Sequence, residues 1–228
     1  TIVVTGATGF IGRHLIEALH REHEIWALSR SSPSLRSVSL PASVRWLPVD
    51  IARTDQLREA VAVMGRVGRP EVLIHLAGHY DFTGERHPEY LRTNVEGTRN
   101  VLEAAGELGV RHLVYASSVA ACGFPRVGEV VTESSPADGD TPYAESKRLA
   151  EAMLADYRGV FRTTIVRFGA VFSDWCEYEP LFRFLETWLS RRAQGRILAG
   201  SGLSAIPYVH IRDVVDFLRR RLARWDGR

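Results

Sequence analysis

Lysine is nearly absent from this sequence. Of its 29 basic residues, 28 are arginine and one is lysine, Lys147. A chain with this bias favours arginine, so a lysine in it suggests a position where a guanidinium would serve poorly. We weigh that hypothesis only together with the neighbours of Lys147.

Other absences narrow the class of protein. The 27 acidic residues nearly balance the basic ones, so the net charge of +2 gives no reason to expect a nucleic-acid or membrane partner. No apolar run is long enough to span a bilayer, and no signal peptide precedes the first predicted strand. Two cysteines, Cys122 and Cys176, predict a reducing, cytoplasmic location. We expect no metal, because His75 and His79 stand on either side of a strand end.

Strands and helices are predicted to alternate along most of the chain. Short β-branched runs predict strands, and apolar residues three or four apart predict helices. The predicted strands are 2–5, 24–28, 44–49, 72–76, 110–116 and 163–167, and the predicted helices are 12–21, 54–64, 90–108 and 142–157. This alternation predicts an α/β fold with a doubly wound parallel sheet, the Rossmann fold.

The alternation weakens after Arg167. Helices are predicted at 181–192 and 213–224, with a strand at 206–210 between them. We therefore predict a nucleotide-binding domain at 1–170 and a small substrate-binding portion at 171–228 packed on it. The absence of a linker between them favours one compact body.

A glycine-rich turn connects the first predicted strand to the first predicted helix. Gly6, Gly9 and Gly12 permit a tight turn and let backbone N–H groups approach a pyrophosphate at a helix N-terminus. The second strand is followed by Ser29 and Arg30, with no acidic residue at 27–32. Because an acid there holds the ribose of NAD and an arginine suits the 2′-phosphate of NADP, we favour NADP over NAD. The abundance of arginine keeps NAD open as the alternative.

Tyr143 and Lys147 stand four residues apart on one predicted helix and so share a face. An ammonium beside a phenol lowers its pKa, which would suit a tyrosine that transfers protons near neutral pH. Ser117 and Ser118 come just after the predicted strand 110–116, at the sheet edge where ligands bind. We expect Ser118 to hold a reacting oxygen and Ser117 to bond its own backbone.

Taken together, the motifs resemble those of the extended short-chain dehydrogenase/reductase superfamily, the NAD-dependent epimerase/dehydratase family. The matching segments, which cover nearly the whole chain, are Thr5-Gly6-Ala7-Thr8-Gly9-Phe10-Ile11-Gly12, Asp50-Ile51, His75-Leu76-Ala77-Gly78, Asn94-Val95-Glu96-Gly97-Thr98, Ser117-Ser118, Tyr143-Ala144-Glu145-Ser146-Lys147 and Val209-His210-Ile211-Arg212-Asp213. The family usually continues past the point where this sequence stops, so we expect the substrate-binding portion to be truncated.

The resemblance implies a role for each matching position. Tyr143 would be the general acid/base, Lys147 would bind the nicotinamide ribose and lower the tyrosine pKa, and Ser118 would orient the substrate. Asn94 would either support the nicotinamide or pack at a helix start. The remaining implied cofactor-binding residues are Gly6, Thr8, Gly9, Phe10, Ile11, Gly12, Ser29, Arg30, Asp50, Ile51, Leu76, Ala77 and Gly78.

Departures from the family pattern bear on the substrate. Val119 and Ala120 stand where sugar-nucleotide 4,6-dehydratases carry an acidic pair, and Cys122 and Ala170 stand where many epimerases carry Tyr and Asn. We therefore predict an NADP- or NAD-dependent oxidoreductase that acts on a carbonyl or alcohol of a small molecule. A nucleotide-sugar epimerase and a non-catalytic NADP sensor remain alternatives. A homodimer through helices 90–108 and 142–157 is expected by analogy.

Overall fold

The computed structural model of the chain describes residues 1–31, 41–123, 125, 128–191, 193–197 and 205–225. Position 192, the predicted end of one helix, and positions 198–204 lie outside the described residues. The residue contacts divide the chain into two units, one of residues 1–124 and 131–167 and the other of residues 125–130 and 168–228.

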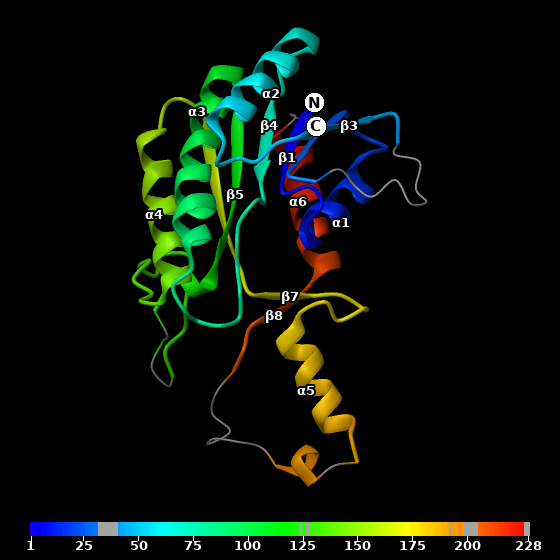
Figure 1. Ribbon diagram of the computed structural model, residues 1–228, viewed down its shortest axis with the longest axis vertical. Coiled ribbons are helices and arrows are strands. Elements are labelled where there is room, and N and C mark those ends of the chain that lie inside the picture. The colour runs from blue at the N-terminus through cyan, green and yellow to red at the C-terminus, as the bar shows by residue number, and fades with distance from the viewer. Residues whose placement is uncertain (32–40, 124, 126–127, 192, 198–204, 226–228) are drawn as a thin grey trace. The chain divides into compact units, whose positions relative to one another are not determined.

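A six-stranded sheet forms the centre of the first unit (Figure 1). Its strands are β1 (Ile2–Thr5), β2 (Ile25–Ser29), β3 (Val44–Pro48), β4 (Val72–His75), β5 (His112–Ser118) and β6 (Arg162–Phe168). Their order is β3-β2-β1-β4-β5-β6, and the pairs from β3 to β5 are parallel. The predicted doubly wound sheet is confirmed. The order reverses between β1 and β4, which is where such sheets bind ligands.

The helices of this unit are α1 (Phe10–Leu19), α2 (Thr54–Val67), a π-helix η1 (Tyr90–Gly97), α3 (Thr98–Leu108) and α4 (Pro142–Asp156), with a short 3₁₀ turn η2 (Val119–Ala121) after β5. The main apolar core draws its helical residues from α2, α3 and α4. Figure 1 shows these three helices on one side of the sheet and α1 on the other. Apolar residues at helical spacing produce this burial, for example Leu15 and Leu19 of α1, which are fully buried.

The predicted helix at 90–108 differs from the observed one. Its first eight residues form the π-helix η1, and the regular α-helix begins only at Thr98. A π-helix adds a residue to each turn, is rare, and is frequent at functional sites. Apolar spacing alone does not reveal it, because the pattern continues through both segments.

The second unit contains β7 (Ala170–Phe172), α5 (Glu179–Leu189), a 3₁₀ turn η3 (Ala193–Arg196), β8 (Tyr208–His210) and α6 (Ile211–Trp225). Strands β7 and β8 pair in parallel as a sheet of their own. Strand β7 was not predicted from the sequence, whereas the equally short β8 lies within the predicted strand at 206–210. None of the described helices combines the length and the apolar character that crossing a membrane requires.

A buried histidine makes the fold sensitive to acid. His75 is fully buried between the hydroxyls of Thr5 and Thr98, at 2.7 and 3.1 Å, and burial lowers its pKa to about 3. The unfolded chain binds a proton on His75 near pH 6.5, whereas the folded chain does so only near pH 3. The stability that neutral His75 contributes is therefore fully present above about pH 6.5 and is lost as the pH falls toward 3. We expect unfolding free energy from urea titrations to fall by about 1.4 kcal/mol per pH unit in this window.

The variant His75→Asn tests this assignment. It should show a smaller loss of unfolding free energy between pH 7.5 and 5.5 than the wild type, by about 1.4 kcal/mol. His112, whose pKa burial lowers to about 4, should account for much of the remainder. An unchanged pH dependence in His75→Asn would contradict the assignment.

Candidate functional site

The turn after β1 requires glycine at two positions, Gly6 and Gly12, where a side chain would collide with neighbouring backbone atoms. Gly6 has φ +66°, and a Cβ there would lie 2.7 Å from the backbone nitrogen of Ala77, at the end of β4. A Cβ on Gly12 would lie 2.4 Å from the Gly6 carbonyl oxygen. The turn therefore brings its backbone against the loop after β4 and starts α1 directly behind it.

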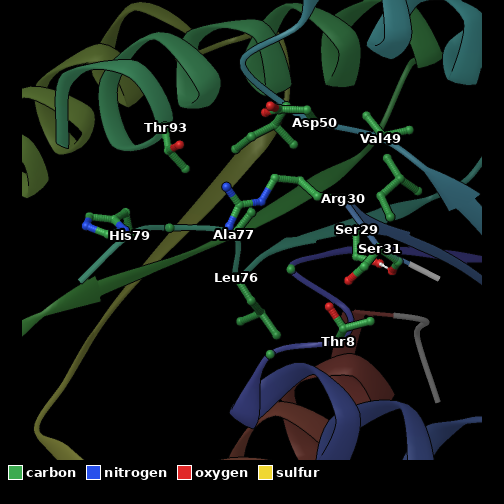
Figure 2. Close-up of a pocket in the computed structure, with 15 residues that line it drawn as sticks. Thr8, Ser29, Arg30, Ser31, Val49, Asp50, Leu76, Ala77, His79 and Thr93 are labelled. Carbon is green, nitrogen blue, oxygen red and sulfur yellow. Dashed lines mark hydrogen bonds between the residues drawn. The ribbon is translucent and has the colours of Figure 1, made fainter. Parts of the chain in front are cut away.

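A groove lies where the carboxyl ends of β1, β2 and β4 meet (Figure 2). The predicted cofactor residues that line it are Gly6, Thr8, Gly9, Ser29, Arg30, Asp50, Ile51, Leu76, Ala77 and Gly78. Those that do not line it are Phe10, Ile11, Gly12, Asn94, Tyr143 and Lys147. The groove also has lining residues that were not predicted, namely Leu28, Ser31, Val49, His79 and Thr93. Each of these five is the immediate neighbour of a predicted position in the sequence.

Charged side chains cross this groove. Arg30, with a side chain 68% exposed, lies 3.8 Å from Glu89, and Figure 2 shows it extending into the groove. Asp50 pairs with Arg92. Burial acts to raise the pKa of Asp50, but the bond from Arg92, the Ala52 N–H and the nearby positive charges together hold it below its usual value. Asp50 is therefore ionised at neutral pH.

Asn94, at the centre of the π-helix, fixes the loop after β4. Its amide oxygen accepts from the His79 N–H at 2.7 Å, and its amide nitrogen donates to the His79 carbonyl and to Ser146, both at 3.0 Å. Asn94 is 1% exposed. These contacts hold the loop after β4 against α4. The other role, support of the nicotinamide by Asn94, stays a prediction.

Lys147 points from α4 toward the ends of β4 and β5. Its ammonium donates to the Ala116 carbonyl at 2.8 Å, and a Cβ on Gly78 would lie 3.5 Å from it. The side chain is buried, and burial lowers its pKa to about 8 although Glu151 acts to raise it. A charged Lys147 is therefore present at neutral pH and is lost as the pH rises through about 8.

Tyr143 and Lys147 share a face of α4 as predicted, and the Lys147 ammonium lies 5.8 Å from the centre of the tyrosine ring. The predicted effect of Lys147 on the tyrosine is not observed. Burial raises the pKa of Tyr143, and an opposing side-chain hydrogen bond with Ser118 is too weak to reverse the shift. The expectation was wrong because it ignored desolvation, which favours the neutral phenol.

The two serines that end β5 make different contacts. Ser118 faces Tyr143 and accepts from the Ala120 N–H at 3.1 Å. Ser117 donates to Glu151, not to its own backbone as predicted. Glu151 is in turn paired with Arg167 at 2.7 Å, and both side chains are largely buried. This buried pair was not predicted, because Glu151 lies on α4 and Arg167 on β6, 16 positions apart, and no local sequence pattern connects them.

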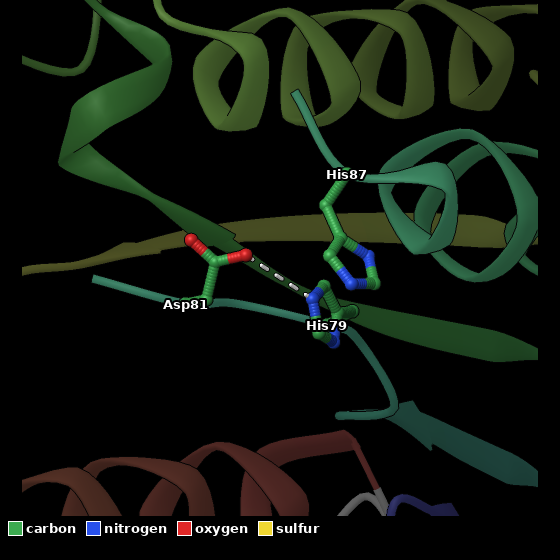
Figure 3. A group of neighbouring side chains, drawn as sticks. All are labelled: His79, Asp81 and His87. Carbon is green, nitrogen blue, oxygen red and sulfur yellow. Dashed lines mark ion pairs between the residues drawn. The ribbon is translucent and has the colours of Figure 1, made fainter. Parts of the chain in front are cut away.

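Three side chains that could hold a metal gather on the loop after β4 (Figure 3). His79, Asp81 and His87 have their ligand atoms within 4.8 Å of one another, and His79 Nε2 lies 3.5 Å from Asp81. The Glu89 N–H donates to His87 Nδ1 at 3.2 Å. Neutral His87 therefore carries its proton on Nε2, which leaves that ring no free lone pair for a metal. That the chain binds no metal stays a prediction.

Comparison with known proteins agrees with this geometry. The family model described as NAD dependent epimerase/dehydratase family matches residues 2–227. The chain belongs to this family. It is 34% identical to a putative dihydroflavonol 4-reductase of Synechocystis sp. over 153 residues, which cover 65% of this chain and 42% of that one. It is 31% identical to 3 beta-hydroxysteroid dehydrogenase type 7 of Rattus norvegicus over 169 residues, which cover 69% and 48%.

Solved structures of this family share the fold. The UDP-glucose 4-epimerase of Thermus thermophilus, solved in complex with NAD, superposes with a TM-score of 0.73 at 27% identity. The match covers 94% of this chain and 72% of the epimerase. The chain spans about half the length of the curated relatives named above.

Proposed function

We propose that this chain is an NADP(H)-dependent oxidoreductase that interconverts a carbonyl and an alcohol of a small molecule. The observation that carries the proposal is the placing of Tyr143, Ser118 and Lys147 on α4 and β5 of the same unit whose β1–β4 groove has a glycine cradle for a dinucleotide. Residues 1–170 would bind the cofactor and 171–228 would contribute to substrate binding. The two free cysteines favour the cytoplasm as its location.

The roles of the side chains follow from their chemistry. The nicotinamide, when bound, supplies or accepts a hydride at the reacting carbon. Tyr143 would donate its phenolic proton to the carbonyl oxygen during reduction and accept it during oxidation. Ser118 would hold that oxygen by a hydrogen bond, and Lys147 would hold the ribose hydroxyls and stabilise the phenolate as it forms.

Arg30 carries the proposed preference for NADP. It lines the groove with Ser29 and Ser31, whereas the solved epimerase structure described above contains NAD. Charge-assisted contacts with a phosphate contribute about 1.5–3 kcal/mol, so Arg30→Ala should weaken NADPH binding roughly tenfold to a hundredfold and NADH binding by less than about threefold. Fluorescence titration with both cofactors measures this.

Arg45→Ala is the matched control for Arg30→Ala. Arg45 is also an exposed arginine of the first unit, and its guanidinium stacks on Trp26 at 5.3 Å, away from the groove. The Arg45→Ala variant should bind NADPH and NADH as tightly as the wild type does. Tighter binding of NADH than NADPH by the wild type would contradict the NADP preference but leave the oxidoreductase proposal standing.

A nucleotide-sugar epimerase is the second candidate, because UDP-glucose 4-epimerases are among the relatives. Cys122, at the position where many epimerases carry tyrosine, is buried and accepts from Arg167 at 3.3 Å. The discriminating experiment gives the full chain NADPH with a panel of ketones and aldehydes, and separately gives it UDP-galactose with NAD⁺, because epimerisation begins with oxidation of the sugar. NADPH oxidation with a carbonyl supports the first proposal, and epimerisation alone supports the second. Cofactor binding with neither reaction supports a sensor.

We also propose a homodimer. A groove between η1 and α4 is lined in part by Leu91 and Leu149, which are 58% and 44% exposed. Apolar side chains on two adjacent helix faces suit a self-complementary contact. Sedimentation should give a dimeric mass for the wild type and a monomeric mass for Leu149→Glu. A monomeric wild type would contradict the proposal.

A further inference from the structure

Two aromatic side chains are exposed beside Tyr143. Tyr80 and Phe82, on the loop after β4, are 49% and 48% exposed, and their rings meet edge to face with centres 4.9 Å apart. The Tyr80 ring also lies 4.5 Å from the Tyr143 ring. We call Tyr80 and Phe82 the aromatic platform. Exposed aromatic pairs of this kind are a common means of binding flat apolar molecules.

The backbone beneath the platform is held in place. Asn94 bonds both the N–H and the carbonyl of His79, the residue before Tyr80. Asp81, between the two aromatic residues, accepts from the N–H and the hydroxyl of Thr83 at 3.0 and 2.6 Å. A fixed platform binds without the entropic loss of ordering a loop.

The charges near the platform disfavour a diphosphate. Asp81 lies between Tyr80 and Phe82 in the sequence, and the hydrogen bonds from Thr83 lower its pKa although burial acts to raise it, so it is negative at neutral pH. The next acid along the loop is Glu85, and the basic residue after it, Arg86, lies 3.7 Å from Glu145. A phosphorylated substrate group placed here would meet like charge.

We propose that the platform selects substrates in which an aromatic ring is attached close to the reacting carbonyl. The ring would stack on Tyr80 and Phe82, and the carbonyl oxygen would lie at the Tyr143 hydroxyl. This inference rests on the proposed carbonyl reductase function and names its substrate class. The platform and the proton donor belong to one structural unit, so the proposed stacking contact needs no residue of the other.

The test compares acetophenone with cyclohexyl methyl ketone, which has the same carbon skeleton but a saturated ring. The full chain with NADPH should show a kcat/KM roughly tenfold higher for acetophenone, near the upper end of what aromatic pairing adds. Tyr80→Leu should remove this preference by raising KM for acetophenone, with kcat nearly unchanged. Tyr80→Phe should keep the preference because it keeps the ring.

A binding measurement separates failure of this inference from failure of the proposed function. Ligand-observed NMR with NADP⁺ present should detect acetophenone binding that Tyr80→Leu loses and Tyr80→Phe retains, even if no ketone turns over. Turnover of both ketones at equal efficiency, or equal binding by Tyr80→Leu and the wild type, would overturn the aromatic platform and leave the reductase proposal intact. Aryl binding that Tyr80→Leu loses, with no turnover of any compound in the carbonyl panel, would instead overturn the reductase proposal and leave the platform as a site that binds aryl groups.

Discussion

Tyr143→Phe is expected to lower kcat for carbonyl reduction about a thousandfold, within the range for loss of a positioned general acid. The substitution removes only the hydroxyl. The ring, which lies 4.5 Å from Tyr80 and 5.9 Å from Tyr90, keeps its packing. NADPH affinity and thermal stability should therefore change little. Steady-state kinetics together with cofactor titration measure both effects.

Tyr157→Phe is the matched control for Tyr143→Phe. Tyr157 follows the other end of the same helix and stacks on Phe161 at 5.4 Å, so the control loses a hydroxyl without touching the groove. It should keep kcat within about twofold, as surface changes away from a site usually do. A Tyr143→Phe variant with more than half of the wild-type kcat would refute the assigned proton donor.

Lys147→Arg is expected to lower kcat/KM about a hundredfold even though it preserves the charge. Lys147 is buried, with its ammonium 2.8 Å from the Ala116 carbonyl and 3.5 Å from where a Cβ on Gly78 would lie, so we expect a wider, planar guanidinium to be crowded there. Lys147→Met should lose at least as much activity. Such losses would explain why a chain with 28 arginines has its one lysine here.

The pH profile separates an electrostatic role of Lys147 from a merely structural one. The pKa of Lys147 is lowered to about 8 by burial, so the ammonium is lost as the pH rises through that value. Wild-type kcat/KM for reduction should therefore fall above about pH 8, and Lys147→Met should lack this step. A variant that retains the same step would show that another group titrates, and wild-type activity in Lys147→Arg would contradict the packing argument.

The fold could be predicted because its signals are local. Strand runs such as 2–5 and the glycines of the first turn depend on neighbouring residues, and the alternation of strands with helices predicts a doubly wound parallel sheet. The order of the strands in that sheet was not predicted from the sequence. The pairing of Asp50 with Arg92 joins residues 42 positions apart and has no local signal. The same holds for the contact of Ser117 with Glu151.

The sequence was sufficient to predict which residues share the helix face of the site, but not the direction of their pKa shifts. Sequence spacing placed Tyr143 and Lys147 on one helix face, and the structure agrees. The direction of the tyrosine pKa shift depends on how deeply the ring is buried, which spacing does not reveal. The aromatic platform likewise depends on how the loop at 79–90 folds under the control of Asn94.

Transfer of deuterium tests the central claim most directly. The full chain is given NADPH carrying deuterium at the reactive position of the nicotinamide, together with acetophenone, and the alcohol is analysed by mass spectrometry. The proposed function predicts one deuterium on the carbinol carbon of the product, and almost none from Tyr143→Phe in the same time. Tight binding of NADPH with no labelled alcohol from acetophenone or any other carbonyl compound would contradict it.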